Sequence, residues 1–135
     1  LAGVIGGIAD VPHGIACATL LAPVIDANVH ALRSEGHGVH GVYGVYGVYG
    51  VRPALDRYAR AARLLTGEPA ASVQDGVAWI QQTLTLLAVP GLASFGLGPQ
   101  HADEIAAKAL ISSSMQGNPV ALSHGDLKAI LLLAL

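Results

Sequence analysis

A single histidine, His13, lies at the start of a long apolar segment, in the sequence DVPHGIACATLLAPV of residues 10–24. Pro12 favours the first turn of a helix, where its missing N–H is not needed, and the Asp10 side chain can accept a hydrogen bond from a free helical N–H. His13 is therefore predicted to lie in the opening turn, where the positive end of the helix dipole disfavours the imidazolium form. A neutral imidazole can bind a cation through its lone pair, but a lone histidine at a helix start more often packs or caps. The spacing alone leaves both roles open.

The other reactive residue types are weaker candidates. Cys17 is the only cysteine and lies between small apolar residues, so we expect a small core residue rather than a nucleophile. A single thiol also excludes an internal disulfide and fits a reducing compartment, and the predicted localisation is cytoplasmic. Ser123, His124 and Asp126 have the residue types of a hydrolase triad, but neighbours on one helical turn point in different directions. We expect Ser123 and Asp126 to cap a helix instead.

The composition describes one apolar domain with few charges. Of the 135 residues, 53% are hydrophobic and 12% are charged, whereas a typical domain has roughly 25% charged residues. Part of the surface must therefore be covered by a partner or remain apolar. The formal net charge of −2 and the lack of a basic cluster argue against a nucleic-acid partner. No membrane segment is predicted, because glycines, Asp10, Pro12 and Pro23 divide residues 1–25 into pieces shorter than the ~20 residues of a spanning helix.

Apolar residues recur mostly with a helical period, which predicts an all-α fold, a helical bundle. A buried central helix is expected over residues 14–30, because apolar residues occupy nearly every side. An amphipathic helix with Leu55, Tyr58, Ala59, Ala62 and Leu65 on its apolar side is expected to end at Gly67. Further helices are expected over residues 73–88, with a stripe of Val77, Ile80, Leu84 and Leu87, over residues 102–112, and from Ser123 onward.

A Gly-Val-Tyr repeat within residues 34–52 interrupts the helical pattern. Glycine at every third position without proline cannot hold a collagen triple helix, and a period of three fits neither a helix nor a strand. We expect an expanded loop inserted in the domain, with an aromatic binding or self-association segment as the alternative. His37 and His40 are too few ligands on a glycine-rich backbone to form a metal site.

Several segments, in order along the chain, resemble the C-terminal helical domain of the iron-containing alcohol dehydrogenases. The resembling segments are residues 6–16 with GG and DVPHGIA, 20–28 with LLAPV and Asn28, 55–65 (LDRYARAARLL), 75–80 (DGVAWI), 89–92 (VPGL) and 113–123 (SSMQGNPVALS). The resemblance covers nearly the whole chain apart from about residues 34–52. Several motifs in the right order are more specific than one short pattern.

The resemblance implies that residues 1–135 are part of a larger two-domain enzyme. In the family, an N-terminal α/β domain binds NAD(P), and an aspartate and three histidines hold Fe²⁺ or sometimes Zn²⁺. His13 matches the last of these histidines, in the Pro-His-Gly motif. The preceding histidine falls just upstream of Leu1, and the other two ligands lie further upstream, so this chain would hold one metal ligand of the four. Gly3 takes the place of a non-ligating histidine near the nicotinamide, which puts a proton relay or substrate orientation in doubt.

The implied function is that of the metal-binding C-terminal domain of an NAD(P)-dependent alcohol dehydrogenase, which interconverts alcohols and aldehydes by hydride transfer. The expected partners are the nucleotide-binding domain, further copies of the chain in a homo-oligomer, and a small alcohol or aldehyde. Alone, the chain is expected to be inactive and to bind no Fe²⁺, Zn²⁺ or NAD(P) tightly. The alternative is a non-catalytic, self-associating helical module derived from the family, with a contact face around residues 1–8 and the start of the central helix.

Overall fold

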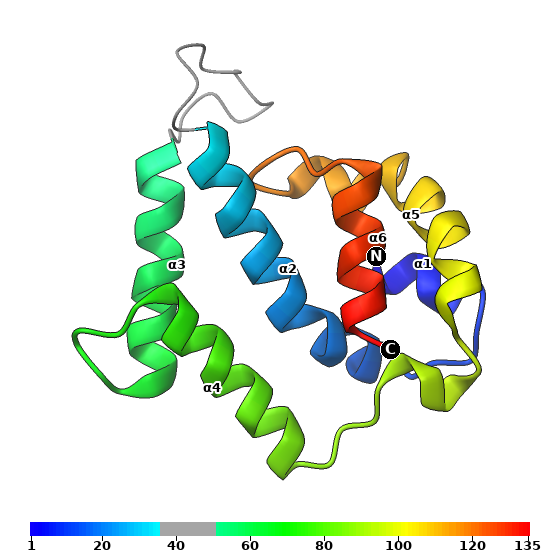
Figure 1. Cartoon of the computed structure of the whole chain (residues 1–135), viewed down its shortest axis with the longest axis horizontal. Coiled ribbons are helices and arrows are strands. Elements are labelled where there is room, and N and C mark those ends of the chain that lie inside the picture. Colours follow the sequence, from blue (N-terminus) through cyan, green and yellow to red (C-terminus); the bar gives the residue numbers. More distant parts are fainter. Residues whose placement is uncertain (36–50) are drawn as a thin grey trace.

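The computed structural model describes residues 1–35 and 51–135, and all regular structure in these ranges is helical (Figure 1). This confirms the predicted all-α fold. Three short 3₁₀ segments, Leu92–Phe95, Pro99–His101 and Ser113–Gly117, lie between the fourth and the last helix. The helices are α1 (Ala2–Gly6), α2 (His13–Glu35), α3 (Val51–Thr66), α4 (Val73–Leu86), α5 (Ala102–Leu110) and α6 (His124–Leu133).

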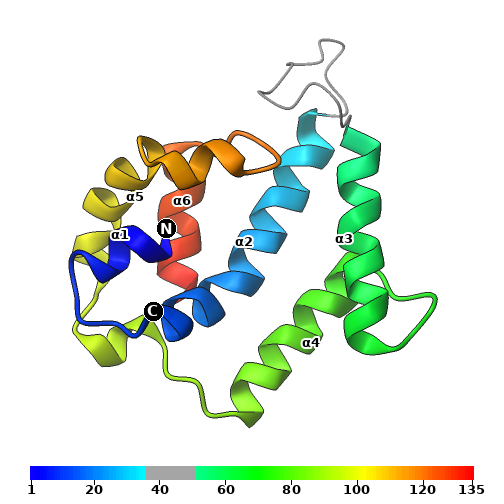
Figure 2. The same cartoon turned by 180° about the vertical axis from the view of Figure 1, so that it is seen from behind.

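Helix α2 is central and separates two groups of helices (Figures 1 and 2). The α3–α4 hairpin packs on one side of α2, whereas α1 and α6 pack on the other side, and α5 covers α1 and α6. The main hydrophobic core lies in this second group, where Ile5, Ala16, Leu127 and Ile130 are at most 1% exposed. α2 therefore holds the two groups together.

Helix α2 is longer than the predicted helix over residues 14–30, because it continues through Pro23 to Glu35. The prediction that Pro23 divides the apolar N-terminal region is wrong. A proline removes one helical hydrogen bond, and packing on both sides of α2 offsets this loss. By length and composition alone, His13–Ser34 could cross a membrane, but α2 contacts α1, α3, α4 and α6 as the central helix of a bundle does.

Helices α4 and α6 both begin with a capping box. The Ser123 hydroxyl accepts a hydrogen bond from the Asp126 N–H at 3.2 Å, and the Asp126 carboxylate accepts one from the Ser123 N–H at 2.8 Å. Ser72 and Asp75 form the same pair of bonds. The serine hydroxyl and N–H hold the pKa of the Asp75 and Asp126 carboxyls below the usual value. The predicted capping role of Ser123 and Asp126 is confirmed.

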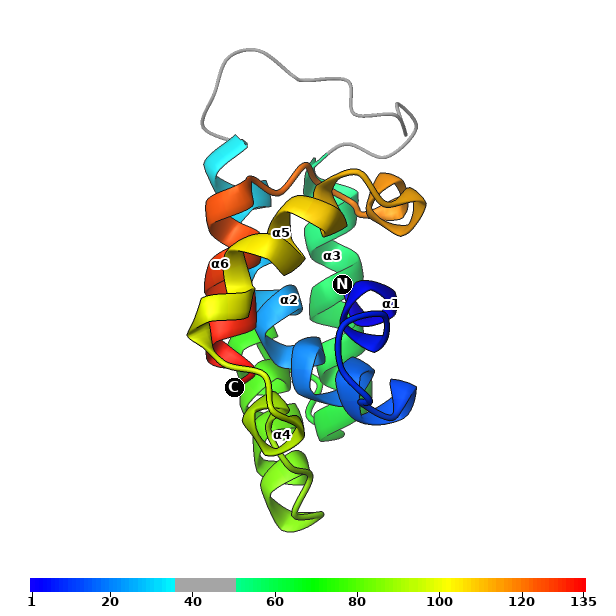
Figure 3. The ribbon, with the colours of Figure 1, turned by 90° about the vertical axis from the view of Figure 1, so that its right-hand side faces the viewer.

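The α3–α4 hairpin is close-packed at one glycine. A Cβ atom at Gly76 would lie 2.6 Å from the Cβ of Ala62, so only glycine allows this approach. α3 ends at Gly67 as predicted, where φ is +74°. Ala62 and Ile80 are buried as expected, whereas Leu65 and Leu87 are 39% and 69% exposed. Their predicted burial is wrong, because the hairpin packs mainly against α2 and the end of α4 extends beyond the other helices (Figure 3).

The neighbouring helices extend into the range predicted as a loop, residues 34–52, since Ser34 and Glu35 belong to α2 and Val51 and Arg52 belong to α3. The Gly-Val-Tyr repeat, with His37 and His40, lies outside the described residues. Its interpretation as a loop or as an aromatic segment stays a prediction.

Candidate metal site

His13 is the first residue of α2, in the predicted opening turn, and its side chain is exposed. The Pro12 carbonyl accepts hydrogen bonds from the N–H groups of Ile15 and Ala16 at 2.9 and 3.1 Å. Pro12 therefore takes the cap position. The expected cap by Asp10 is wrong, because Asp10 lies two residues before the cap position and its exposed side chain makes no hydrogen bond to α2 in the described structure. His13 has the accessibility that a ligand needs.

Cys17 lies one helical turn after His13 and is also exposed, with its Sγ 3.4 Å from the His13 Nε2. The prediction of a small core residue is therefore wrong. Ala16 and Leu20 face the core, and residues four apart share a face, so His13 and Cys17 lie together on the outer face of α2. Sequence reasoning missed this pair, although the spacing of four residues is the signal that could have revealed it.

The beginning of the described chain lies near this pair. Helix α1 packs against α2, and Leu1 is partly buried beside the core. Burial lowers the pKa of the Leu1 amino group.

The described chain offers a pair of ligands and not a closed metal site. Among residues 1–35 and 51–135, no group of three or more His, Cys, Asp or Glu side chains could hold a metal ion. Two other histidines have different partners: His101 accepts a hydrogen bond from the Gly98 N–H, and His124 lies beside Asp103 of α5. A tight zinc or iron site needs three or four protein ligands, so the remaining ligands would have to come from outside the described residues.

Residues 1–135 match the family model described as the Fe-containing alcohol dehydrogenase family, C-terminal. The chain belongs to this family. Comparison with curated proteins and with solved structures gave no match. The match confirms the resemblance found in the sequence, and the all-α fold agrees with the helical C-terminal domain of Fe-containing alcohol dehydrogenases. Membership of this family implies Fe and NAD(P) in the intact parent enzymes. The role of His13 as a metal ligand stays a prediction.

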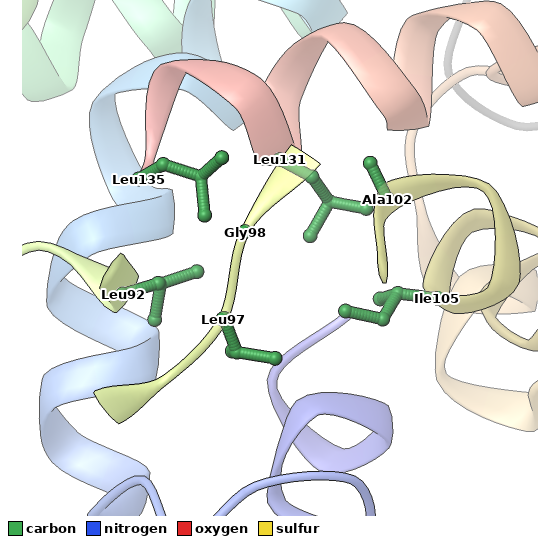
Figure 4. Close-up of a pocket in the computed structure, with 7 residues that line it drawn as sticks. All are labelled: Leu92, Leu97, Gly98, Ala102, Ile105, Leu131 and Leu135. Carbon is green, nitrogen blue, oxygen red and sulfur yellow. The ribbon is translucent and has the colours of Figure 1, made fainter. Parts of the chain in front are cut away.

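A small pocket in this Fe-containing alcohol dehydrogenase domain lies between the segment after α4 and helices α5 and α6 (Figure 4). Its volume is about 10 Å³, which is no more than one water molecule occupies. Apolar side chains and one glycine line it: Leu92, Leu97, Gly98, Ala102, Ile105, Leu131 and Leu135. This pocket is a packing gap and is too small for a nicotinamide or an alcohol substrate.

A buried polar network fixes α2 relative to its neighbours. The Asn28 side-chain amide of α2, 2% exposed, donates hydrogen bonds to the Tyr58 hydroxyl at 3.0 Å and to the Asn118 Oδ1 at 3.1 Å. Asn118 donates in return to the Asn28 Oδ1 and to the Val120 carbonyl, both at 2.7 Å. Burial raises the pKa of the Tyr58 hydroxyl, and the bond with Asn28 partly offsets this. The sequence patterns place Asn118 only within the resembling segment 113–123 and do not predict this network.

Proposed function

We propose that this chain is the metal-binding C-terminal domain of an NAD(P)-dependent alcohol dehydrogenase and that His13 is a metal ligand. The observation that carries the proposal is an exposed imidazole on the first residue of α2, within the Pro-His-Gly segment of a chain that matches the family along its whole length. Among the described residues, its Nε2 forms a hydrogen bond only with Cys17. Imidazole suits both Fe²⁺ and Zn²⁺, so the residue fits either metal.

The remaining ligands would come from residues that precede Leu1 in the intact protein. The packing of α1 against α2 supports this, because a segment that precedes α1 would enter the domain beside α2. When bound, the cation polarises an alcohol or carbonyl oxygen during hydride transfer with the nicotinamide. His13 would bind the cation and fix its place at the start of α2. Gly3 is exposed and has no side chain, so it cannot move a proton at this site.

The proposed partners are an N-terminal nucleotide-binding domain and a small alcohol or aldehyde. Neither nucleic acid nor a membrane is proposed, because the net charge is −2 and α2 packs as a central helix. The proposed localisation is cytoplasmic.

Metal analysis tests this proposal. We expect the dialysed 135-residue chain to be nearly metal-free, since its few ligands cannot complete a stable site. We expect the intact two-domain protein to retain about one Fe²⁺ or Zn²⁺ per chain, and His13→Ala to remove most of it. His30→Ala is the matched control, because His30 is also exposed on α2. Full metal occupancy in His13→Ala would exclude His13 as a ligand.

The second candidate, a self-associating helical module, is favoured by the apolar residues on the α3–α4 hairpin. Leu64, Leu86 and Leu87 are 77%, 86% and 69% exposed. The expected contact face at residues 1–8 is less open, because Leu1, Val4 and Ile8 are partly buried against the core. We therefore place the proposed homo-oligomer contact on the hairpin, whether the chain acts alone or within an enzyme.

Sedimentation at micromolar concentration tests self-association. We expect a dimer or larger species, and we expect Leu86→Glu to shift it at least ~10-fold toward monomer, because a charge would enter an apolar contact. Gln82→Glu adds the same charge at an exposed position one turn earlier on α4 and is the matched control. A monomer of the unchanged chain over the whole concentration range contradicts the proposal.

A further inference from the structure

We propose that the α3–α4 hairpin is a hinged unit, which separates from α2 as a whole while α1, α2, α5 and α6 stay packed together. This motion goes beyond the proposed function, because it does not depend on metal binding by His13.

The buried apolar side chains of the described chain fall into two groups of unequal size. The main core lies among α1, α2, α5, α6 and the segments that join them, and its fully buried members include Ile5, Leu92, Leu127 and Ile130. The second group, which we call the hairpin seam, belongs to α2 and the hairpin: Ala22, Val29, Ala62, Ala71, Val73 and Ile80. Half of these residues are alanines. Because burial stabilises roughly in proportion to apolar area, the hairpin seam contributes less free energy than the main core does.

Helix α4 depends on the hairpin seam for its attachment. The structure describes α4 over its whole length, and none of its residues belongs to the main core or packs against it. Helix α3 reaches the edge of the main core only in its first half, where Ala54, Leu55 and Tyr58 are partly buried. The Tyr58 hydroxyl also accepts a hydrogen bond from Asn28 of α2. The hairpin is therefore held to the domain by the hairpin seam and by a partly exposed contact at one end.

The two helices of the hairpin are built to move together. Glycine at position 76 lets α4 approach Ala62 of α3 more closely than a Cβ atom would allow. The capping box of Ser72 and Asp75 fixes the start of α4 directly after the turn. Contacts between α3 and α4 are also more extensive than those of either helix with α2. A separation from α2 would thus keep the hairpin intact.

The hairpin ends at a sharp boundary with the main core. Leu86 at the end of α4 is 86% exposed, whereas Leu92 is 1% exposed. Between them, Ala88 has a φ of +51°, which is uncommon for a residue other than glycine. An extended segment then joins α4 to the other group of helices (Figures 1 and 2). Residues 87–91 can therefore act as the hinge.

Amide hydrogen exchange of the 135-residue chain in increasing urea tests the opening. Elements with few buried apolar contacts open at free energies below that of global unfolding. We expect amides of α3 and α4 to share one protection factor, at least ~10-fold lower than that of α6. We also expect its urea dependence to be weaker than that of α6, because opening exposes only part of the buried surface. Mass spectrometry on a dilute sample measures both.

Two matched variants, Ile80→Val in the hairpin seam and Ile130→Val in the main core, each remove one buried methylene group. We expect Ile130→Val to lower the protection of α6 by ~3- to 10-fold and to leave that of α4 within about twofold, because the main core stays folded when the hairpin opens. Ile80→Val should lower the protection of both helices by ~3- to 10-fold, since the hairpin is detached in both opened states. Circular dichroism checks that the variants fold.

Two results would overturn the hinged hairpin. Equal protection of α4 and α6 in the unchanged chain, or an equal loss in both helices with Ile130→Val, would show that the domain opens only as one unit. Exchange of α4 that is indifferent to urea and to Ile80→Val would show fraying of a helix end. Neither result bears on metal binding by His13, which the metal analysis tests separately.

Discussion

In the proposed intact two-domain enzyme, His13→Ala is expected to lower kcat for alcohol oxidation by at least ~100-fold, in parallel with metal occupancy. A cation held by His13 would stabilise the charge that develops on the substrate oxygen, which is worth several kcal/mol in the transition state. His13 is exposed, so its replacement removes a ligand without opening the core. Steady-state kinetics and elemental analysis on the same preparation measure the two losses together.

The expected pattern is specific to metal binding. His30→Ala should keep kcat within about twofold, because His30 lies nearly five turns further along α2 and away from Cys17. Excess Zn²⁺ or Fe²⁺ should restore part of the activity of His13→Ala if the variant binds the metal weakly. An unchanged kcat in His13→Ala would show that His13 is not a metal ligand.

The helices could be predicted where local chemistry fixes them. Ser123 and Asp126 form a capping box within four residues, and Gly67 ends α3 with a positive φ, so both boundaries are readable from neighbouring residues. Helix α1 was not predicted, because it has only five residues, two of them glycines, and is held by packing on α2. The path of α2 through Pro23 likewise depends on tertiary packing, which a local rule does not include.

The candidate site was predicted only in part, for a physical reason. The position of His13 follows from Pro12 and the start of an apolar helix. Cys17 was assigned to the core from the polarity of its sequence neighbours, whereas its exposure depends on which side of α2 faces α1 and α6. Asn28 and Asn118 lie 90 positions apart, so no local pattern could pair them.

The polar network of Asn28 supports the largest expected change in stability. Asn28→Ala is expected to lower the free energy of unfolding of the chain by ~2–4 kcal/mol. The change removes three side-chain hydrogen bonds, leaves the Asn118 Oδ1 and the Tyr58 hydroxyl without the Asn28 partner, and opens a small cavity at this buried position. Urea unfolding followed by circular dichroism measures the difference.

Ser34→Ala is the matched control on the same helix, because the Ser34 hydroxyl is exposed and bonds only to the His30 carbonyl. Ser34→Ala should lower the free energy of unfolding by less than about 0.5 kcal/mol. Tyr58→Phe should cost about 1 kcal/mol, since it removes one bond and leaves the paired amides of Asn28 and Asn118 intact. The double variant Asn28→Ala with Asn118→Ala should lose less stability than the sum of the single variants, because each single change already breaks the shared bonds. Strict additivity, or a loss for Asn28→Ala as small as that for Ser34→Ala, would show that the network does not hold α2 against α3 and the segment before α6.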